Sequence, residues 1–257
     1  MTDQVLKESI DVVVISTLRP KLLKLTLASF QKHFLNQFGN YRIILNVDPV
    51  GEENSSQDAI LALVNRYSEN VIACTPKTGN FSQAVRWAWS QVESPYFLHL
   101  EDDWFLKKKV LKDDIFEQFV LDEELAGIRL NLSRNPSELP LYSDGLSLNP
   151  SIFRTSVIQS LLGNFDIAKD PEKQFRNNES LKMYNFFYYG RPKESSFVVD
   201  TGKKWRKSLG LAKWEITSTD VSWIQSPRKL QLLQKLFYKA KYRMFLGLWK
   251  LRLGLGI

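Results

Sequence analysis

Over its first hundred residues the sequence alternates two kinds of pattern, and this alternation constrains the fold more than any other feature. Four runs are rich in β-branched and aromatic residues, as is typical of strands buried on both faces of a sheet. They lie at 11–17, 41–47, 71–74 and 96–100. Amphipathic stretches with helical periodicity lie between them, at about 20–34, 55–67 and 81–92. Short links between such elements require right-handed crossovers, so the sequence predicts an α/β, Rossmann-like fold with a central, mostly parallel sheet flanked by helices.

Beyond residue 113 the pattern is less regular. We expect, in order, an acidic helix, a strand, a proline-containing loop, a strand that turns into a helix, a flexible polar loop and a further helix. These segments lie at 113–124, 127–132, 133–142, 146–162, 166–178 and 179–189.

Polar residues follow each of the first four predicted strands at the point where the strand ends. Thr17 and Arg19 follow the first strand, Asp48 the second and Lys77 the third, while Glu101-Asp102-Asp103 follows the fourth. In parallel α/β sheets, ligands bind beyond the carboxyl ends of the strands. We therefore expect these side chains to share one edge of the sheet and to line a binding site.

The acidic stretch Glu101-Asp102-Asp103 is the most informative of these groups. Three adjacent carboxylates at the end of a buried strand repel one another. A hard cation such as Mn²⁺ or Mg²⁺ relieves the repulsion, because it takes oxygen ligands and bridges to a diphosphate. There it would neutralise a leaving nucleoside diphosphate. The alternative is a solvated acidic turn, or a capping cluster for a helix that begins near Val110.

Four motifs in this order resemble those of the GT-A glycosyltransferases, most closely the large inverting family 2. They are Val13-Val14-Ile15-Ser16-Thr17-Leu18-Arg19-Pro20, Asn46-Val47-Asp48, Gly79-Asn80-Phe81-Ser82-Gln83-Ala84 and Leu100-Glu101-Asp102-Asp103. The resemblance covers residues 11–105, and 145–190 more loosely. It implies a GT-A fold and an enzyme that moves a sugar from a nucleotide-sugar donor to a hydroxyl of a glycan or lipid-linked acceptor. It also implies inversion at the anomeric carbon and Mn²⁺ or Mg²⁺ as cofactor.

On the donor side, the resemblance implies that Thr17 and Arg19 line the nucleoside pocket and that Asp48 hydrogen-bonds the base, which suits the uracil of a UDP-sugar. Asp103 would be the direct metal ligand, with Asp102 near the ribose or a metal-bound water. Glu101 stands where the family commonly has an Asp. The expected donor-binding set is Thr17, Arg19, Asp48, Lys77, Asn80, Glu101, Asp102, Asn149, Lys203 and Arg206. Two alternatives stay open, a turn cap for Asp48 and a plain surface charge for Arg19.

An inverting transfer needs a general base that deprotonates the acceptor hydroxyl. The segment Asn177-Asn178-Glu179-Ser180-Leu181 resembles the family's Glu-Asp-x-x-Leu segment, which implies Glu179 as the catalytic base. Asp166 and Glu172 are lesser candidates, and Ser180 replaces the family's second acid. Alternatively, Glu179 is only a first-turn carboxylate that interacts with a helix dipole.

Asp200 stands where many GT-A enzymes place a late metal-binding His, so the resemblance implies Asp200 as a second metal ligand. Lys203 and Arg206 would then contact the diphosphate. The alternative is a surface turn with solvated lysines. The segment Leu148-Asn149-Pro150-Ser151 resembles the family's loop beside the donor sugar, or is an ordinary Asn-Pro turn.

The C-terminal stretch 228–257 differs in composition from the rest of the chain. It holds eight of the 35 Lys and Arg residues and none of the 28 Asp and Glu residues, so the remainder has no basic excess. No nucleic-acid partner is therefore expected. Basic residues among many apolar ones predict an amphipathic helix on an anionic membrane surface, or else a helix packed on the body or on a second subunit. We expect a GT-A domain at 1–227 and this tail at 228–257.

The single cysteine, Cys74, excludes an internal disulfide, and the N-terminus lacks a signal-peptide pattern. We therefore expect a cytoplasmic protein, peripheral at the inner face of a membrane. Two other functions stay open. A nucleotidyltransferase usually has a glycine-rich phosphate loop after its first strand, and Ser16-Thr17-Leu18-Arg19-Pro20 contains no glycine. A catalytically silent relative that binds sugar nucleotides or membranes is the other.

Overall fold

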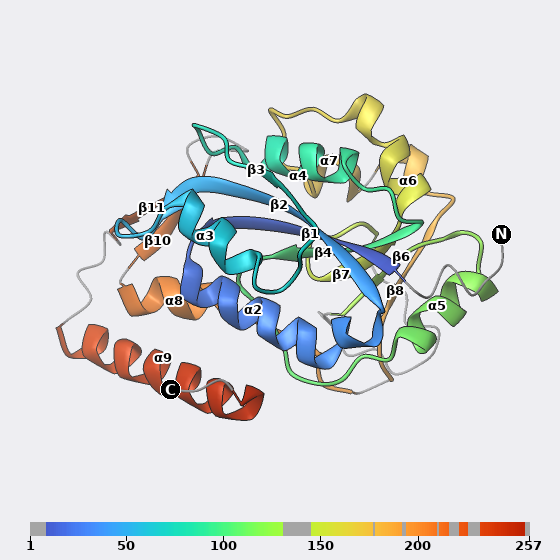
Figure 1. Cartoon of the computed structure of the whole chain (residues 1–257). Coiled ribbons are helices and arrows are strands. Elements are labelled where there is room, and N and C mark those ends of the chain that lie inside the picture. The colour runs from blue at the N-terminus through green and yellow to red at the C-terminus, as the bar shows by residue number, and fades with distance from the viewer. Residues whose placement is uncertain are drawn as a thin grey trace.

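A seven-stranded sheet forms the centre of the computed structural model, which describes residues 9–130, 145–176, 178–191, 194–209, 211–215, 221–225 and 232–254 (Figure 1). The strand order is β3-β2-β1-β4-β7-β6-β8, and only β7 runs antiparallel to its neighbours. The strands are β1 (Ser9–Leu18), β2 (Asn40–Gly51), β3 (Val71–Cys74), β4 (Tyr96–Glu101), β6 (Leu125–Arg129), β7 (Ser151–Arg154) and β8 (Asn185–Tyr188). The four strands predicted in the first hundred residues are confirmed as its parallel half. The proline-containing loop predicted at 133–142 lies outside the described residues.

Helices cover both faces of this sheet, because alternate residues of the central strands point to opposite sides. Val12 and Val14 of β1 pack in one core cluster with α2 and α3, whereas Val13 and Ile15 pack in a second cluster with α4 and α6. The first layer contains α2 (Pro20–His33), α3 (Gln57–Val64) and α5 (Lys112–Leu121), and the second contains α4 (Phe81–Ser90) and α6 (Thr155–Ser160). The predicted mostly parallel sheet flanked by helices is confirmed.

The second half departs from prediction at two places. The helix predicted at 179–189 is wrong, because the chain forms a short 3-10 turn, η3 (Glu179–Leu181), and then strand β8. The aromatic run Asn185–Tyr188 pairs with β6, and Phe186 is buried in the second core cluster. The polar loop predicted at 166–178 contains a short helix, α7 (Lys173–Arg176). Two further 3-10 turns are η1 (Leu35–Gln37) and η2 (Leu162–Asn164).

A small two-stranded sheet joins the end of β4 to the C-terminal part of the chain. Strand β5 (Trp104–Leu106) follows the acidic turn and pairs antiparallel with β9 (Val198–Asp200). Helix α8 (Gly202–Leu209) follows β9, so its first turn lies beside the acidic turn. The hairpin of β10 (Leu211–Glu215) and β11 (Val221–Gln225) then leads to α9.

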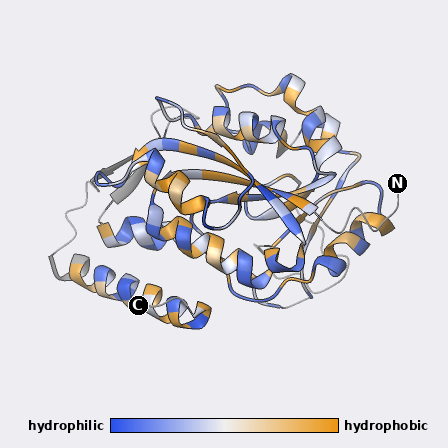
Figure 2. Cartoon of the chain, viewed as in Figure 1, coloured by the Kyte–Doolittle hydropathy of each residue, from blue (hydrophilic) through white to orange (hydrophobic). Residues whose placement is uncertain are grey.

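The predicted C-terminal helix is confirmed as α9 (Leu232–Leu253), which lies alongside α8 and α2 (Figure 1). Hydrophobic and hydrophilic residues alternate along it (Figure 2). Phe105 stacks on Trp249, with 4.1 Å between the ring centroids, and Lys32 Nζ donates a hydrogen bond to the Arg252 carbonyl. Among the described helices, none is long and apolar enough to cross a membrane.

His99 is a core residue of β4, as the apolar sequence around it predicts. Its side chain has no exposed surface, and its Nδ1 accepts a hydrogen bond from Trp89 Nε1 of α4 at 3.3 Å. Within the described residues its Nε2 has no partner. Burial lowers the pKa of His99 to about 3, so the folded protein holds this imidazole neutral.

We predict that His99 makes the folded state sensitive to acid. The unfolded imidazole takes up a proton near pH 6.5, whereas the folded one does so only near its pKa of about 3. The contribution of neutral His99 to the free energy of unfolding is therefore complete above pH 6.5 and is lost as the pH falls toward 3, by up to about 1.4 kcal/mol per pH unit.

Urea denaturation at several pH values between 7 and 5 measures this effect in the wild type and in His99→Gln. The difference in unfolding free energy between the two proteins should fall as the pH decreases. His33→Gln serves as the control, because His33 is only half-buried. This variant should keep most of the wild-type dependence of unfolding free energy on pH. A difference between wild type and His99→Gln that stays constant over this range contradicts the prediction.

Candidate active site

The ends of β1 and β4 are held together by Asp102. Ile15 of β1 pairs with Glu101 of β4, and the next amide, Asp102 N, donates to the Ile15 carbonyl at 3.1 Å. Asp102 Oδ2 then accepts hydrogen bonds from Thr17 N at 2.9 Å and from Thr17 Oγ1 at 3.0 Å. Arg19 binds the same carboxylate through Nε and Nη2. Both oxygens of Asp102 are thus engaged by the chain itself.

Arg19 is the cation at the centre of this corner. Its Nη1 donates to Asp103 Oδ2 at 2.9 Å, and its guanidinium carbon lies 5.5 Å from the centre of the Trp205 ring of α8. Only 4% of Arg19 is exposed, so the alternative of a plain surface charge is wrong. Burial opposes its charge, but Asp102 and Asp103 outweigh that effect and hold the pKa of Arg19 above its ordinary value. The corner therefore contains a permanent positive charge.

Asp103 is fixed from the other side by the start of α8. Its carbonyl accepts hydrogen bonds from Thr201 N at 2.8 Å and from Thr201 Oγ1 at 2.6 Å. A Cβ atom on Gly202 would collide with the Asp103 carboxylate, so a larger residue there would have to displace Asp103 from its place beside Arg19. Sequence reasoning missed Thr201 and Gly202 as site residues; the only signal was their position directly after Asp200.

Glu101 completes the acidic turn. Its burial, together with the charges of Asp103 and Asp102, raises the pKa of Glu101 well above its usual range, although Arg19 opposes the shift. The predicted repulsion within the trio is thus present, and Arg19 relieves it for Asp102 and Asp103. Repulsion from Asp103 and Asp102 still acts on the carboxylate of Glu101.

Asp48 lies at the end of β2 on the same edge. It is 7% exposed, and Asn46 Nδ2 donates to its Oδ1 at 2.8 Å. Burial raises the pKa of Asp48 to about 6, with the charge of Asp102 adding to the shift and the hydrogen bond from Asn46 opposing it. Ser16 of β1 pairs with Val47 of β2, so Asp48 lies at the same edge as Thr17 and Arg19, which follow β1. Asp48 is buried and is bound by the Asn46 side chain, whereas a simple turn cap is exposed and bonds to its own backbone.

The other predicted donor residues lie around this edge with different exposure. Asn80 is the N-cap of α4, and its Oδ1 accepts from Gln83 N at 2.9 Å, while Lys77 is exposed after β3. Ser151 pairs with His99, which places Asn149, two residues earlier, at the edge where β4 ends. Among the α8 residues, Lys203 is exposed and Arg206 is half-buried.

The predicted metal ligands do not form a complete coordination site made of protein side chains alone. Within the described residues, no three His, Cys, Asp or Glu side chains are grouped to hold a metal ion. Asp102 is saturated by Arg19 and Thr17, and Asp200 is exposed and caps α8 by accepting from Lys203 N at 3.0 Å. Mg²⁺ and Mn²⁺, however, are commonly held by one or two carboxylates plus substrate phosphates and waters. Asp103, with Glu101 beside it, fits that mode.

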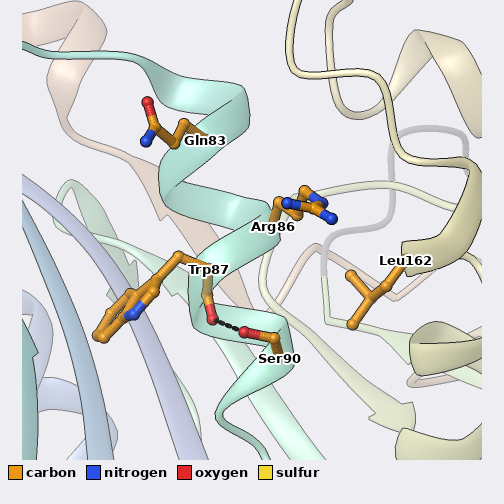
Figure 3. Close-up of a pocket in the computed structure, with 5 residues that line it drawn as sticks. All are labelled: Gln83, Arg86, Trp87, Ser90 and Leu162. Atoms are coloured by element: carbon orange, nitrogen blue, oxygen red, sulfur yellow. Dashed lines mark hydrogen bonds between the residues drawn. The ribbon is translucent and has the colours of Figure 1, made fainter.

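The two candidate catalytic bases lie in exposed parts of the second half. The Glu179 carboxylate pairs with Lys182 Nζ at 2.6 Å, and that of Asp166 pairs with Lys169 Nζ at 3.3 Å. In the described part of the chain, their hydrogen bonds and ion pairs join them to their own loops rather than to the acidic corner. A separate surface pocket lies along the outer side of α4, lined by Gln83, Arg86, Trp87, Ser90 and Leu162 (Figure 3).

No protein-family model and no curated protein sequence matches the chain. Solved structures do. S. aureus TarS 1–349 superposes with a TM-score of 0.51 and 14% identity, over 76% of this chain and 61% of that chain. A mannosyltransferase from Pyrobaculum calidifontis, in complex with GDP-Man and Mn²⁺, gives a TM-score of 0.53 and 11% identity, over 77% of this chain and 60% of that chain. The chain thus spans about three fifths of the length of each of these structures.

A cytidylyltransferase from Leptospira borgpetersenii matches at a TM-score of 0.49 and 13% identity, over 79% of this chain and 85% of that chain. The first two similarities, at 14% and 11% identity, concern the fold alone. This chain has the GT-A glycosyltransferase fold, as the sequence motifs predict.

Proposed function

We propose that the protein is a glycosyltransferase that moves a sugar from a nucleotide-sugar donor, a UDP-sugar, to a hydroxyl of a glycan or lipid-linked acceptor. One observation carries the proposal. Side chains from the ends of β1, β2 and β4 converge with the start of α8 on one edge of a GT-A sheet, and they include a buried cation and three carboxylates with raised pKa values. Perturbed groups that converge at a ligand edge are typical of an active site.

Each group at this edge of the sheet binds a different part of the donor. Asp48 accepts a hydrogen bond from the base, and Thr17 and Arg19 flank the nucleoside. Arg19 also presents its guanidinium to the diphosphate, where a fixed charge stabilises the leaving group without reorganisation. Lys203 and Arg206 of α8 supply further positive charge on that side, and Lys77, Asn80 and Asn149 line the rim.

A divalent ion, Mn²⁺ or Mg²⁺, supplies additional charge neutralisation on the diphosphate when bound. We propose Asp103 as its protein ligand, with Asp200 as the second predicted ligand. On the acceptor side we propose Glu179, or else Asp166, as the general base that takes the hydroxyl proton as the acceptor oxygen attacks the anomeric carbon with inversion. Glu179 is exposed and Asp166 is half-buried at the surface of the second half, where a bound acceptor can reach them.

We predict that Asp103→Asn weakens Mn²⁺-dependent binding of UDP by at least about tenfold, because the amide keeps the shape of the carboxylate but loses the charge that holds the ion. Isothermal titration calorimetry with UDP, with and without Mn²⁺, measures this. The matched control is Asp58→Asn, which removes the same charge from an exposed position in the first turn of α3. Wild-type affinity in Asp103→Asn contradicts the metal assignment.

The same proteins separate the competing functions when incubated with isotopically labelled UDP-sugars and a panel of acceptors. Transfer to an acceptor, or slow hydrolysis to UDP, that Asp103→Asn abolishes supports a glycosyltransferase. Binding without turnover supports a catalytically silent relative. Release of pyrophosphate from a nucleoside triphosphate and a sugar phosphate identifies a nucleotidyltransferase.

We predict that recognition of uracil depends on the charge of Asp48. Uracil N3–H donates a hydrogen bond that an ionised carboxylate accepts, and hydrogen bonds to charged groups are the stronger ones. Because the pKa of Asp48 is about 6, affinity for UDP-glucose should rise by roughly threefold to tenfold between pH 5 and pH 7.5. The diphosphate diester has no group that titrates in this range.

In Asp48→Asn the affinity should be lower at pH 7.5 and independent of pH. Fluorescence or calorimetric titrations at both pH values measure the effect. An unchanged pH profile in Asp48→Asn assigns the titration to another group and contradicts the role of Asp48.

We also propose that α9 contacts an anionic membrane surface through its outer face. Phe237, Met244, Leu248 and Leu251 are each more than half exposed and recur at helical spacing, so they form one apolar stripe, the outer stripe. The exposed Lys241 lies beside it, and the stretch 228–257 carries no acidic residue. An apolar stripe flanked by basic residues is typical of helices that lie in the headgroup region.

We predict that the double substitution Met244→Ser and Leu248→Ser reduces binding to vesicles of phosphatidylglycerol and phosphatidylcholine by about tenfold or more. Two apolar side chains that insert into the membrane in the wild type are then lost. Vesicle co-sedimentation measures it. The control removes two exposed apolar residues from α5, Val120→Ser and Leu121→Ser, and should bind as wild type does. Equal binding by both double variants contradicts the role of the outer stripe.

A further inference from the structure

Helix α9 has a second apolar side that faces the body and lies next to the candidate donor site. Tyr238, Tyr242, Phe245 and Trp249 recur at helical spacing on this side and are partly buried. Lys204 of α8 lies 3.6 Å from the Phe245 ring centre, and Lys207 lies 5.9 Å from that of Tyr238. Helix α9 therefore covers α8, whose first residue touches Asp103.

The course of α9 along α2 brings Tyr242 to the acidic corner. Arg252 is held at the C-terminal end of α2 by Lys32. Ten residues of helix span about 15 Å, so Tyr242 lies toward the start of α2, where Arg19 precedes the helix. Figure 1 shows α9 beside α2 and α8, and the Trp205 ring of α8 lies 5.5 Å from the Arg19 guanidinium carbon, which agrees with this position.

The hydroxyl of Tyr242 is buried and has no hydrogen-bond partner within the described residues. Burial, reinforced by the charges of Glu52 and Asp103, raises the pKa of Tyr242, so the group stays protonated and can donate. A buried hydroxyl without a partner is unfavourable and calls for an explanation, such as a ligand that supplies the acceptor. The proposed function places the diphosphate of the donor, whose oxygens accept hydrogen bonds, at the same corner.

We infer that Tyr242 belongs to the donor site and that its hydroxyl donates a hydrogen bond to the diphosphate of the bound nucleotide sugar. The inference rests on the proposed function, since it assigns a ligand to the same corner. It also gives α9 two distinct faces. The outer stripe faces away from the body, and the inner side closes the donor site with a tyrosine.

The test compares Tyr242→Phe with Tyr238→Phe, which removes the same hydroxyl one turn earlier on the same side of α9. Calorimetric titration with UDP in the presence of Mn²⁺ should show about tenfold weaker binding for Tyr242→Phe and wild-type binding for Tyr238→Phe. The Tm of free Tyr242→Phe should equal or exceed that of the wild type, because the variant loses an unpaired buried hydroxyl.

Wild-type affinity in Tyr242→Phe overturns the inference and leaves the proposed function standing. Equal losses in both variants, or a loss of affinity that accompanies a lower Tm, indicate that the ring only packs α9 in place, and also overturn it. If the wild-type protein binds neither UDP nor GDP, the proposed function fails together with the inference.

Discussion

The corner of the fold where β1 and β4 end depends on one buried ionic arrangement, the guanidinium of Arg19 between the carboxylates of Asp102 and Asp103. Charges this far from water are stable only when they are paired and hydrogen-bonded. The planar fork of arginine can serve two carboxylates at once. Without this cation, the adjacent negative charges of Glu101-Asp102-Asp103 would repel one another without compensation. The sequence alone shows only these three charges.

This arrangement gives the three acids different roles. Both carboxylate oxygens of Asp102 bind Arg19 or Thr17, so Asp102 joins the end of β4 to the end of β1. Asp103 lies between Arg19 and the start of α8, where a side chain in place of Gly202 would displace its carboxylate. Glu101 retains a raised pKa. Positions that are equivalent in a sequence motif thus differ in chemistry, because each has different neighbours.

The parallel half of the sheet could be predicted because each of its strands is a local run of β-branched residues with a turn signal at its end. Strand β8 is missed although its aromatic residues favour a strand, because the sequence pattern predicts a longer helix at 179–189 that ends with this run of four residues; its pairing with β6 decides the strand. Helix α9 was predictable as a helix, but two apolar sides on one helix do not reveal which side faces the body. That choice depends on α8 and α2, which lie far away in the sequence.

The sequence by itself determined the fold class, the edge of the sheet that carries polar groups and the identity of most of those groups. It did so because parallel strands place their carboxyl ends together whatever the rest of the chain does. Only the tertiary structure decided that Arg19 is buried and paired, that Thr201 and Gly202 contact Asp103, and that the Tyr242 hydroxyl is buried. Each of these depends on contacts between residues far apart in the chain, and no periodicity or short motif records such contacts.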